Sequence, residues 1–202
     1  MNMQSGPFFT VEFLGTPEAG KTSVIKMLRK KLSDNYTVRV LNEAAAVRPD
    51  VFETPMYKKS LESHFWMRLT MAARLLELQC NSKPGDILLV ERGVIDAYCW
   101  NYFFAEKEEI PNKVAMHYKG LIQNILTLPN MVIYLKTTPE EAIRRHGGEG
   151  EIVTSEFVQE FDQSISSFLR YSPVPVVTID TTGLSKVEIT AEIHAKIISA
   201  YK

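Results

Sequence analysis

The sequence predicts an α/β fold, a three-layer α/β/α sandwich built around a five-stranded parallel sheet. Short apolar runs alternate with longer amphipathic ones along the 202 residues. A glycine-containing loop joins the first apolar run to the first amphipathic one, and acidic residues follow two later apolar runs. Alternating strands and helices favour a parallel sheet that is covered by helices on both faces.

The first half of the chain is expected to hold three strands and two helices. Four apolar residues at helical spacing predict the first helix, and a turn at Lys83–Asp86 precedes the third strand. The predicted strands are Phe8–Leu14, Tyr36–Leu41 and Ile87–Val90, and the predicted helices are Lys21–Leu32 and Lys58–Cys80.

The second half is expected to continue the alternation. Thr138 and Pro139 fit the N-cap and the first position of a helix, and Ser185 fits the N-cap of the last one. The glycine-rich segment 146–151 is expected to separate two helices rather than two domains. The other predicted elements are strands at Met131–Leu135 and Val174–Ile179 and helices at Val94–Ala105, Pro111–Leu126 and about Ser185–Tyr201.

Composition points to one globular domain, residues 1–202. Apolar residues make up 45% and charged residues 23% of the chain, and the formal net charge is −1. That balance argues against a nucleic-acid-binding protein with a broad basic face. No stretch approaches the ~20 apolar residues that cross a bilayer, and residues 1–7 lack the pattern of a signal peptide. We therefore expect a cytoplasmic protein without a membrane or nucleic-acid partner, and a homodimer is left open.

The segment from Gly15 to Thr22, GTPEAGKT, has the pattern GxxxxGK[ST] between a strand and a helix. This context predicts a P-loop, in which successive backbone N–H groups point at phosphate oxygens. Lys21 is expected to reach the β- and γ-phosphates of ATP, and the Thr22 hydroxyl to bind Mg²⁺. Glu18 is either solvated or in contact with a substrate hydroxyl. The predicted nucleotide-binding residues are Gly15, Thr16, Pro17, Glu18, Ala19, Gly20, Lys21, Thr22 and Ser23.

Charged residues follow two predicted strands at the same edge of the sheet as the P-loop. Glu91 and Arg92 come directly after Ile87–Val90. Glu91 is a candidate Mg²⁺ ligand, and Arg92 could neutralise phosphate or brace an acid; a surface ion pair is the alternative. Glu43 follows the second strand and could accept the proton of an attacking hydroxyl. It could instead cap the turn at 44–46.

Several segments resemble the nucleoside and nucleotide kinase group of P-loop proteins, above all its deoxynucleoside kinase and thymidylate kinase branches. They are GTPEAGKTSVIKMLRKKL, VLNEA, LLVERGVIDAYCW and MVIYLKTTPEEAIRR. The resemblance implies the nucleotide-kinase-like P-loop NTPase fold. It also implies that Glu43 is the general base, that Glu91 and Arg92 form the [DE]R motif, and that Arg145, with Arg144, contacts ATP and the transferring phosphoryl group.

The sequence departs from this group in the lid, expected at about 144–153, and on the acceptor side. The lid continues as His146-Gly-Gly-Glu-Gly-Glu and is poor in arginine. The early part of the long helix, at His64–Arg68, lacks the glutamine with which deoxynucleoside kinases read a base. Arg68 on that helix could bind an acceptor phosphate or form a structural ion pair.

The sequence thus predicts a kinase that transfers the γ-phosphoryl group of ATP, with Mg²⁺, to a small acceptor, most often a nucleoside or nucleotide in this group. Lys21, Glu43, Arg92 and Arg145 are the predicted catalytic residues, and Glu43, Arg68 and Arg92 the predicted acceptor contacts. A non-catalytic ATP-binding protein and a kinase for a non-nucleoside small molecule are the alternatives. A GTPase is disfavoured because Leu135–Thr138 reads LKTT where a guanine-binding NKxD motif would lie.

Overall fold

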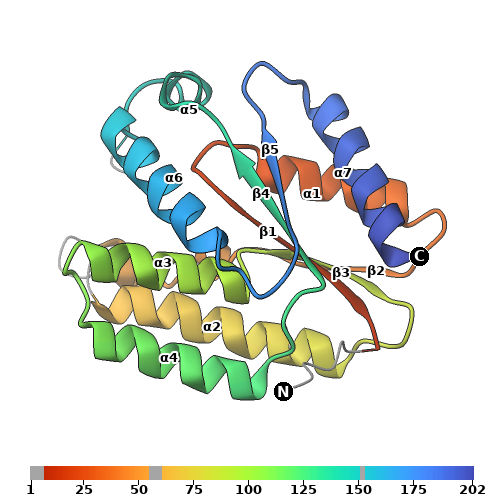
Figure 1. Ribbon diagram of the computed structural model, residues 1–202, viewed down its shortest axis with the longest axis horizontal. Helices are drawn as coiled ribbons and strands as arrows, with labels where there is room; N and C mark the ends of the chain where they lie inside the picture. The colour runs from red at the N-terminus through yellow and green to blue at the C-terminus, as the bar shows by residue number, and fades with distance from the viewer. Residues whose placement is uncertain (1–6, 55–60, 151–152) are drawn as a thin grey trace.

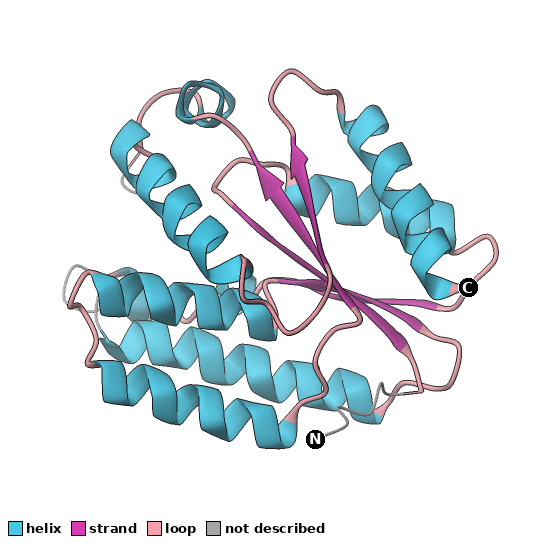
Figure 2. Ribbon diagram, in the orientation of Figure 1, coloured by secondary structure: helices cyan, strands magenta, loops and turns pink. Residues whose placement is uncertain are grey.

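Five short apolar segments form one sheet in the computed structural model, which describes residues 7–54, 61–150 and 153–202. The strand order is β2-β3-β1-β4-β5, and every neighbouring pair is parallel. Figure 2 shows the strands as a twisted central layer with helices on both sides. The strands are β1 (Phe9–Gly15), β2 (Val38–Leu41), β3 (Ile87–Glu91), β4 (Met131–Lys136) and β5 (Val176–Asp180).

Seven α-helices cover the sheet in the part of the chain that the structure describes. In Figure 1, α1 and α7 lie on one face, whereas α2, α3, α4 and α6 lie on the other. The helices are α1 (Lys21–Leu32), α2 (Leu61–Cys80), α3 (Val94–Glu106), α4 (Asn112–Ile125), α5 (Pro139–His146), α6 (Ser155–Leu169) and α7 (Lys186–Tyr201). Two short 3₁₀ helices, η1 (Ala44–Val47) and η2 (Asp50–Glu53), lie between β2 and α2.

The sheet separates two apolar cores. Side chains alternate between the faces of a strand, so Val11 and Phe13 of β1 pack with α1 and α7, whereas Leu14 packs with α2, α3 and α6. The central strands are buried on both faces, which explains why their sequences read as continuous apolar runs. This arrangement confirms the predicted three-layer sandwich.

The structure confirms the predicted strands and helices with shifts of one or two residues at most ends. Thr138 and Ser185 are N-caps, as predicted, and accept hydrogen bonds from the backbone N–H groups of Glu141 and Glu188. The predicted start of the long helix at 58–60 lies outside the described residues. Helix α6 was expected after the glycine-rich segment, but the sequence pattern assigned it no range.

The topology brings the carboxyl ends of all five strands to one edge. The chain completes β2 and β3 on one side of β1 before it crosses to β4 and β5 on the other, and ligands of open α/β sheets bind at such a reversal of strand order. The turn after β1 therefore lies between the segments that follow β3 and β4. No helix of the described residues is long and apolar enough to span a membrane.

Candidate active site

The turn between β1 and α1 contains backbone that passes very close to β4. A Cβ atom on Gly15 would lie 1.8 Å from the backbone oxygen of Leu135. Glycine is therefore required at this position. The backbone N–H of Thr16 donates to the same oxygen over 3.2 Å, and the buried Thr16 hydroxyl accepts from the N–H of Thr137 over 3.2 Å. These contacts fix the start of the turn against β4.

The rest of the turn uses left-handed backbone. Glu18 has φ 57° and Gly20 has φ 88°, and α1 begins directly afterwards at Lys21. Successive residues in such conformations point their N–H groups into one concavity that binds anions, and the helix N-terminus adds a favourable dipole. Of the residues predicted to bind nucleotide, the nine from Gly15 to Ser23 lie together at the end of β1, in this turn and in the first turn of α1, whereas Arg144 lies on α5.

Lys21 is buried beneath the turn. Its side chain is only slightly exposed, and its Nζ donates to the backbone oxygens of Gly15 at 3.0 Å and Thr16 at 2.8 Å. Burial and the nearby positive charge of Arg92 lower the pKa of Lys21 to about 7. An anion bound in the turn would favour the protonated form, so the site has a cation ready for phosphate.

Thr22 and Glu91 form a pair of oxygen donors beside this cation. The Thr22 hydroxyl donates to Glu91 Oε1 over 2.5 Å, and Glu91 is buried at the end of β3. Hydroxyl, carboxylate and phosphate oxygens are the ligands that Mg²⁺ prefers. The pair therefore fits the predicted metal site.

Arg92 links the ends of β2 and β3 to helix α3. Its Nε lies 3.0 Å from Glu43 Oε1, and its Nη1 donates to Asp96 Oδ1 over 3.2 Å. Burial alone would lower the pKa of Arg92, but the carboxylates of Glu43, Asp96 and Glu91 raise it above its ordinary value. The buried Nε–H is not aligned for a hydrogen bond, and the guanidinium carbon lies 5.8 Å from the centre of the Trp100 ring. Glu43 and Arg92 are thus brought together as predicted.

Asp96 is a site residue that the sequence reasoning missed. Its side chain is buried, and burial raises its pKa while Arg92 lowers it. The available signal was its spacing, because residues four apart on a helix lie on one face and form ion pairs. Asp96 stands four positions after Arg92 in a segment that was predicted to be helical.

Arg68 approaches the same region from α2. It is buried, its Nη1 donates to the backbone oxygen of His64 at 2.7 Å, and its guanidinium lies 5.5 Å from the centre of the Phe104 ring. Burial lowers the pKa of Arg68 to about 10, whereas Asp96 acts to raise it. The Nε of Arg68 has no hydrogen-bond partner among the described residues.

The two predicted lid arginines on α5 have different surroundings. Arg144 is largely exposed and donates from Nε and Nη2 to Glu141 at 2.6 and 2.7 Å. Arg145 is mostly covered and donates from Nε to the same carboxylate at 2.8 Å. Hydrogen bonds from Arg144 and then Arg145 lower the pKa of Glu141 to about 2.

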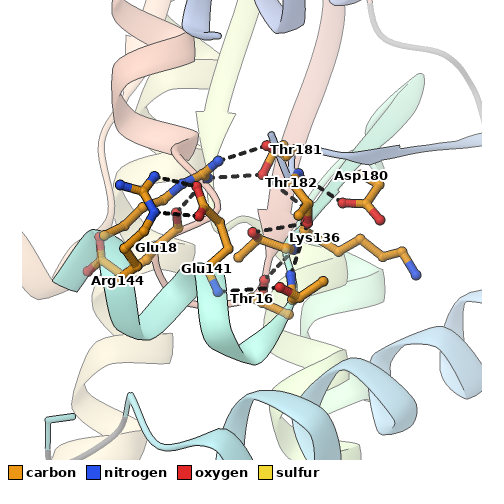
Figure 3. Close-up of polar contacts among 11 residues, drawn as sticks. Thr16, Glu18, Lys136, Glu141, Arg144, Asp180, Thr181 and Thr182 are labelled. Carbon is orange, nitrogen blue, oxygen red and sulfur yellow. Dashed lines mark hydrogen bonds and ion pairs between the residues drawn. The ribbon is translucent and has the colours of Figure 1, made fainter. Parts of the chain in front are cut away.

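Arg145 joins three segments that are distant in the sequence. Its Nη1 donates to the backbone oxygen of Glu18 and to Thr181 Oγ1, both at 3.1 Å, and its Nη2 donates to the backbone oxygen of Thr181 at 2.7 Å. Figure 3 shows Glu18, Glu141 and Thr181 converging between α5, the turn after β1 and the segment after β5. His146 Nδ1 lies 3.4 Å from Glu18 Oε1. The side chain of Glu18 is thus partly solvated and faces the lid.

The sheet edge therefore combines an anion-binding turn, three largely covered cationic side chains (Lys21, Arg68 and Arg92) and several carboxylates. The cations suit a phosphoryl group in transfer, since catalysis of such transfer consists mainly of positioning and charge stabilisation. Glu43 follows β2 and Arg92 follows β3, on the side of β1 away from β4 and helix α5. This arrangement suits the chemistry of a phosphotransferase.

Comparison with known proteins agrees with this chemistry. The sequence model of the family described as deoxynucleoside kinase matches residues 11–200. A thymidylate kinase from Caldanaerobacter subterraneus subsp. tengcongensis is 27% identical over 210 residues, which cover 95% of both chains. The match thus extends over nearly the whole chain rather than the P-loop alone.

Two solved structures share the fold. A deoxyadenosine kinase from M. mycoides, with the products dCMP and dCDP bound, superimposes with a TM-score of 0.72 at 20% identity over 95% of this chain and 100% of that one. The thymidylate kinase from Candida albicans has a TM-score of 0.66 at 15% identity over 98% of this chain and 96% of that one. From the match of the family model, this chain belongs to the deoxynucleoside kinase family and is an ATP-dependent kinase that phosphorylates a nucleoside or nucleotide.

Proposed function

We propose that the acceptor is a nucleoside, which the protein phosphorylates on a sugar hydroxyl. The observation that carries the proposal is the Glu43 carboxylate at the sheet edge, with Arg92 Nε 3.0 Å away. A carboxylate in this place can accept the proton that a hydroxyl loses as it attacks the γ-phosphate. A phosphate acceptor has no such proton to lose in its ionised form.

The charges around Arg92 support the same choice. Two carboxylates, Glu43 and Asp96, already balance its guanidinium. A nucleoside monophosphate would bring its phosphate dianion close to both, and like charges at short range are repulsive. A neutral nucleoside avoids this cost, so the arrangement favours a hydroxyl acceptor.

Each predicted site residue has a role in this proposal. Lys21 and the turn from Gly15 to Ser23 hold the triphosphate of ATP, with Arg144 at the nucleotide side. Arg92 stabilises charge on the transferring phosphoryl group through its guanidinium, which Glu43 and Asp96 hold in place. Arg68 donates to an oxygen of the acceptor. Thr22 and Glu91 would hold Mg²⁺, which would neutralise charge on the phosphates of ATP.

The test is an acceptor screen with γ-labelled ATP over nucleosides, their 5′-monophosphates and ribosylated vitamins, run with Mg²⁺ and with a chelator in excess. We expect labelled monophosphate from at least one nucleoside, and only in the reactions that contain Mg²⁺. Labelled diphosphate from monophosphates, with no product from any nucleoside, would overturn the hydroxyl acceptor. Phosphoryl transfer that persists in excess chelator would contradict the requirement for Mg²⁺.

Arg145 gives a separate prediction. Because its guanidinium holds Glu18 and Thr181, we expect it to act by shaping the nucleotide site rather than by reaching the transferring phosphoryl group. Replacing Arg145 with glutamine should raise KM for ATP by about tenfold, or about 1.4 kcal/mol, and change kcat little. The Arg170→Gln variant, in which an exposed arginine at the C-terminal end of α6 is replaced, is the control and should stay near wild type. A large loss of kcat at unchanged KM would instead support the catalytic role that the sequence predicts for Arg145.

A further inference from the structure

An acidic side chain lies buried in the middle of the sheet, where the mechanism does not use it. Glu12 belongs to β1, the central strand, and its side chain is almost completely buried. Val11 and Phe13 beside it point to the core formed with α1 and α7, so Glu12 points to the opposite face. A buried carboxylate is costly unless polar partners compensate it.

The partners of Glu12 are backbone groups at the start of α3. Glu12 Oε1 accepts the N–H of Asp96 over 2.7 Å. Burial raises the pKa of Glu12 to about 8, while backbone N–H groups of Asp96, Ile95 and Gly93 act in the opposite direction. Gly93 is the N-cap of α3 and provides no side-chain capping bond. Glu12 thus supplies from another strand the acceptor that a helix N-terminus needs.

The sequence between β3 and α3 is adapted to this carboxylate. A Cβ atom on Gly93 would lie 2.7 Å from Glu12 Oε2 and 2.9 Å from Cγ1 of Val90. Arg92 adopts φ 55°, which is uncommon for a residue with a side chain. Its backbone N–H donates to the oxygen of Phe13 at 2.9 Å. The chain therefore bends sharply around Glu12, and Arg92 stands in the bend.

We propose that Glu12 is a positioning residue that sets the place of the Arg92 guanidinium relative to Glu43. The connection runs through Asp96, whose backbone N–H binds Glu12 and whose carboxylate binds Arg92 Nη1 at 3.2 Å. Arg92 in turn lies beside Glu43. This positioning role of Glu12 rests on the proposed function, in which Arg92 acts on the transferring phosphoryl group and Glu43 acts on the acceptor.

The test replaces Glu12 with glutamine, which keeps the size but places an NH₂ group among backbone donors. We expect kcat to fall by about 10- to 100-fold, because a displacement near 1 Å can cost about 100-fold. KM for ATP should change by less than about threefold, since the residues of the phosphate-binding turn keep their contacts. The matched control is Thr10→Val, two positions earlier on the same face of β1. Thr10 is buried, and its hydroxyl has no partner among the described residues.

Two further variants separate positioning from simple support of the core. Gly93→Ala keeps the carboxylate but displaces it, and it should reproduce the loss of kcat. In a double-mutant cycle with Arg92→Ala, adding Glu12→Gln should cost little more than Arg92→Ala alone, since residues that act through one another are not additive. If Glu12→Gln fails to fold, as judged by its thermal transition, Gly93→Ala takes its place in the cycle.

The outcomes are distinguishable from those of the proposed function. Three outcomes would overturn the positioning role of Glu12. The losses of kcat in the double-mutant cycle could be additive, or kcat could be unchanged in a folded Glu12→Gln or Gly93→Ala variant. The third is a loss of kcat in Thr10→Val equal to that in Glu12→Gln. A wild-type protein that phosphorylates monophosphates and no nucleoside would overturn the proposed function instead. The cycle could then still be measured on the phosphate acceptor.

Discussion

Replacing Lys21 with alanine is expected to lower kcat by at least about 100-fold, the range for removing one preorganised electrostatic contact to a transition state. Lys21 is the cation beneath the phosphate-binding turn, and its Nζ holds two of the turn's backbone oxygens. The alanine variant would lose both the positive charge and these contacts. Steady-state transfer from ATP, with the thermal transition measured in parallel, checks the result.

Lys26→Ala is the matched control for this prediction. Lys26 lies on the same helix but is exposed, so its loss should leave transfer near the wild-type rate. Full ATP-dependent transfer by a folded Lys21→Ala variant would contradict the role given to the turn. A variant that binds ATP but does not transfer would support it.

Replacing Glu43 with glutamine is expected to lower kcat by about 10²- to 10⁴-fold, the typical contribution of a general base. Glutamine keeps the size of the side chain but cannot accept the proton of the attacking hydroxyl. The loss should appear with every nucleoside acceptor and should leave KM for ATP nearly unchanged, because the proposed role of Glu43 is toward the acceptor and not toward ATP. Single-turnover transfer to the nucleoside found in the screen is the measurement.

The Asp96→Asn variant separates the role of Glu43 as general base from its ion pair with Arg92. Asp96 is the second carboxylate on Arg92, but in this account it is not the base. We therefore expect a clearly smaller loss of kcat than in Glu43→Gln. Equal losses in the two variants would mean that Glu43 acts only as an ion-pair partner of Arg92.

The sequence predicted those parts of the site that depend on local order in the chain. The P-loop was recognised from its spacing alone. Glu91 and Arg92 were placed beside it because they directly follow an apolar strand, and parallel strands bring their carboxyl ends to one edge. Glu43 was found by the same reasoning. The five strands were also predicted, since runs buried on both faces leave a plain apolar signal.

Other parts depend on contacts between distant segments, which periodicity does not show. Glu12 binds a residue 84 positions away, and Arg145 binds one 36 positions away. The contact of Arg145 with phosphate stays a prediction, whereas its hydrogen bonds to Thr181 could not be read from the sequence. The signal for Glu12 was present, because a charged residue inside a strand buried on both faces needs a buried partner. Helix α6 had no assigned range, because its start follows a glycine-rich segment without a clear boundary.

A competition between two acceptors tests whether the protein phosphorylates a nucleoside hydroxyl rather than a monophosphate. Purified protein would receive Mg²⁺, γ-labelled ATP and equal amounts of the best nucleoside and its 5′-monophosphate, and the labelled mono- and diphosphate would be quantified at early times. We expect the labelled monophosphate to dominate and to be lost in Glu43→Gln. Labelled diphosphate as the main product, insensitive to Glu43→Gln, would contradict this expectation.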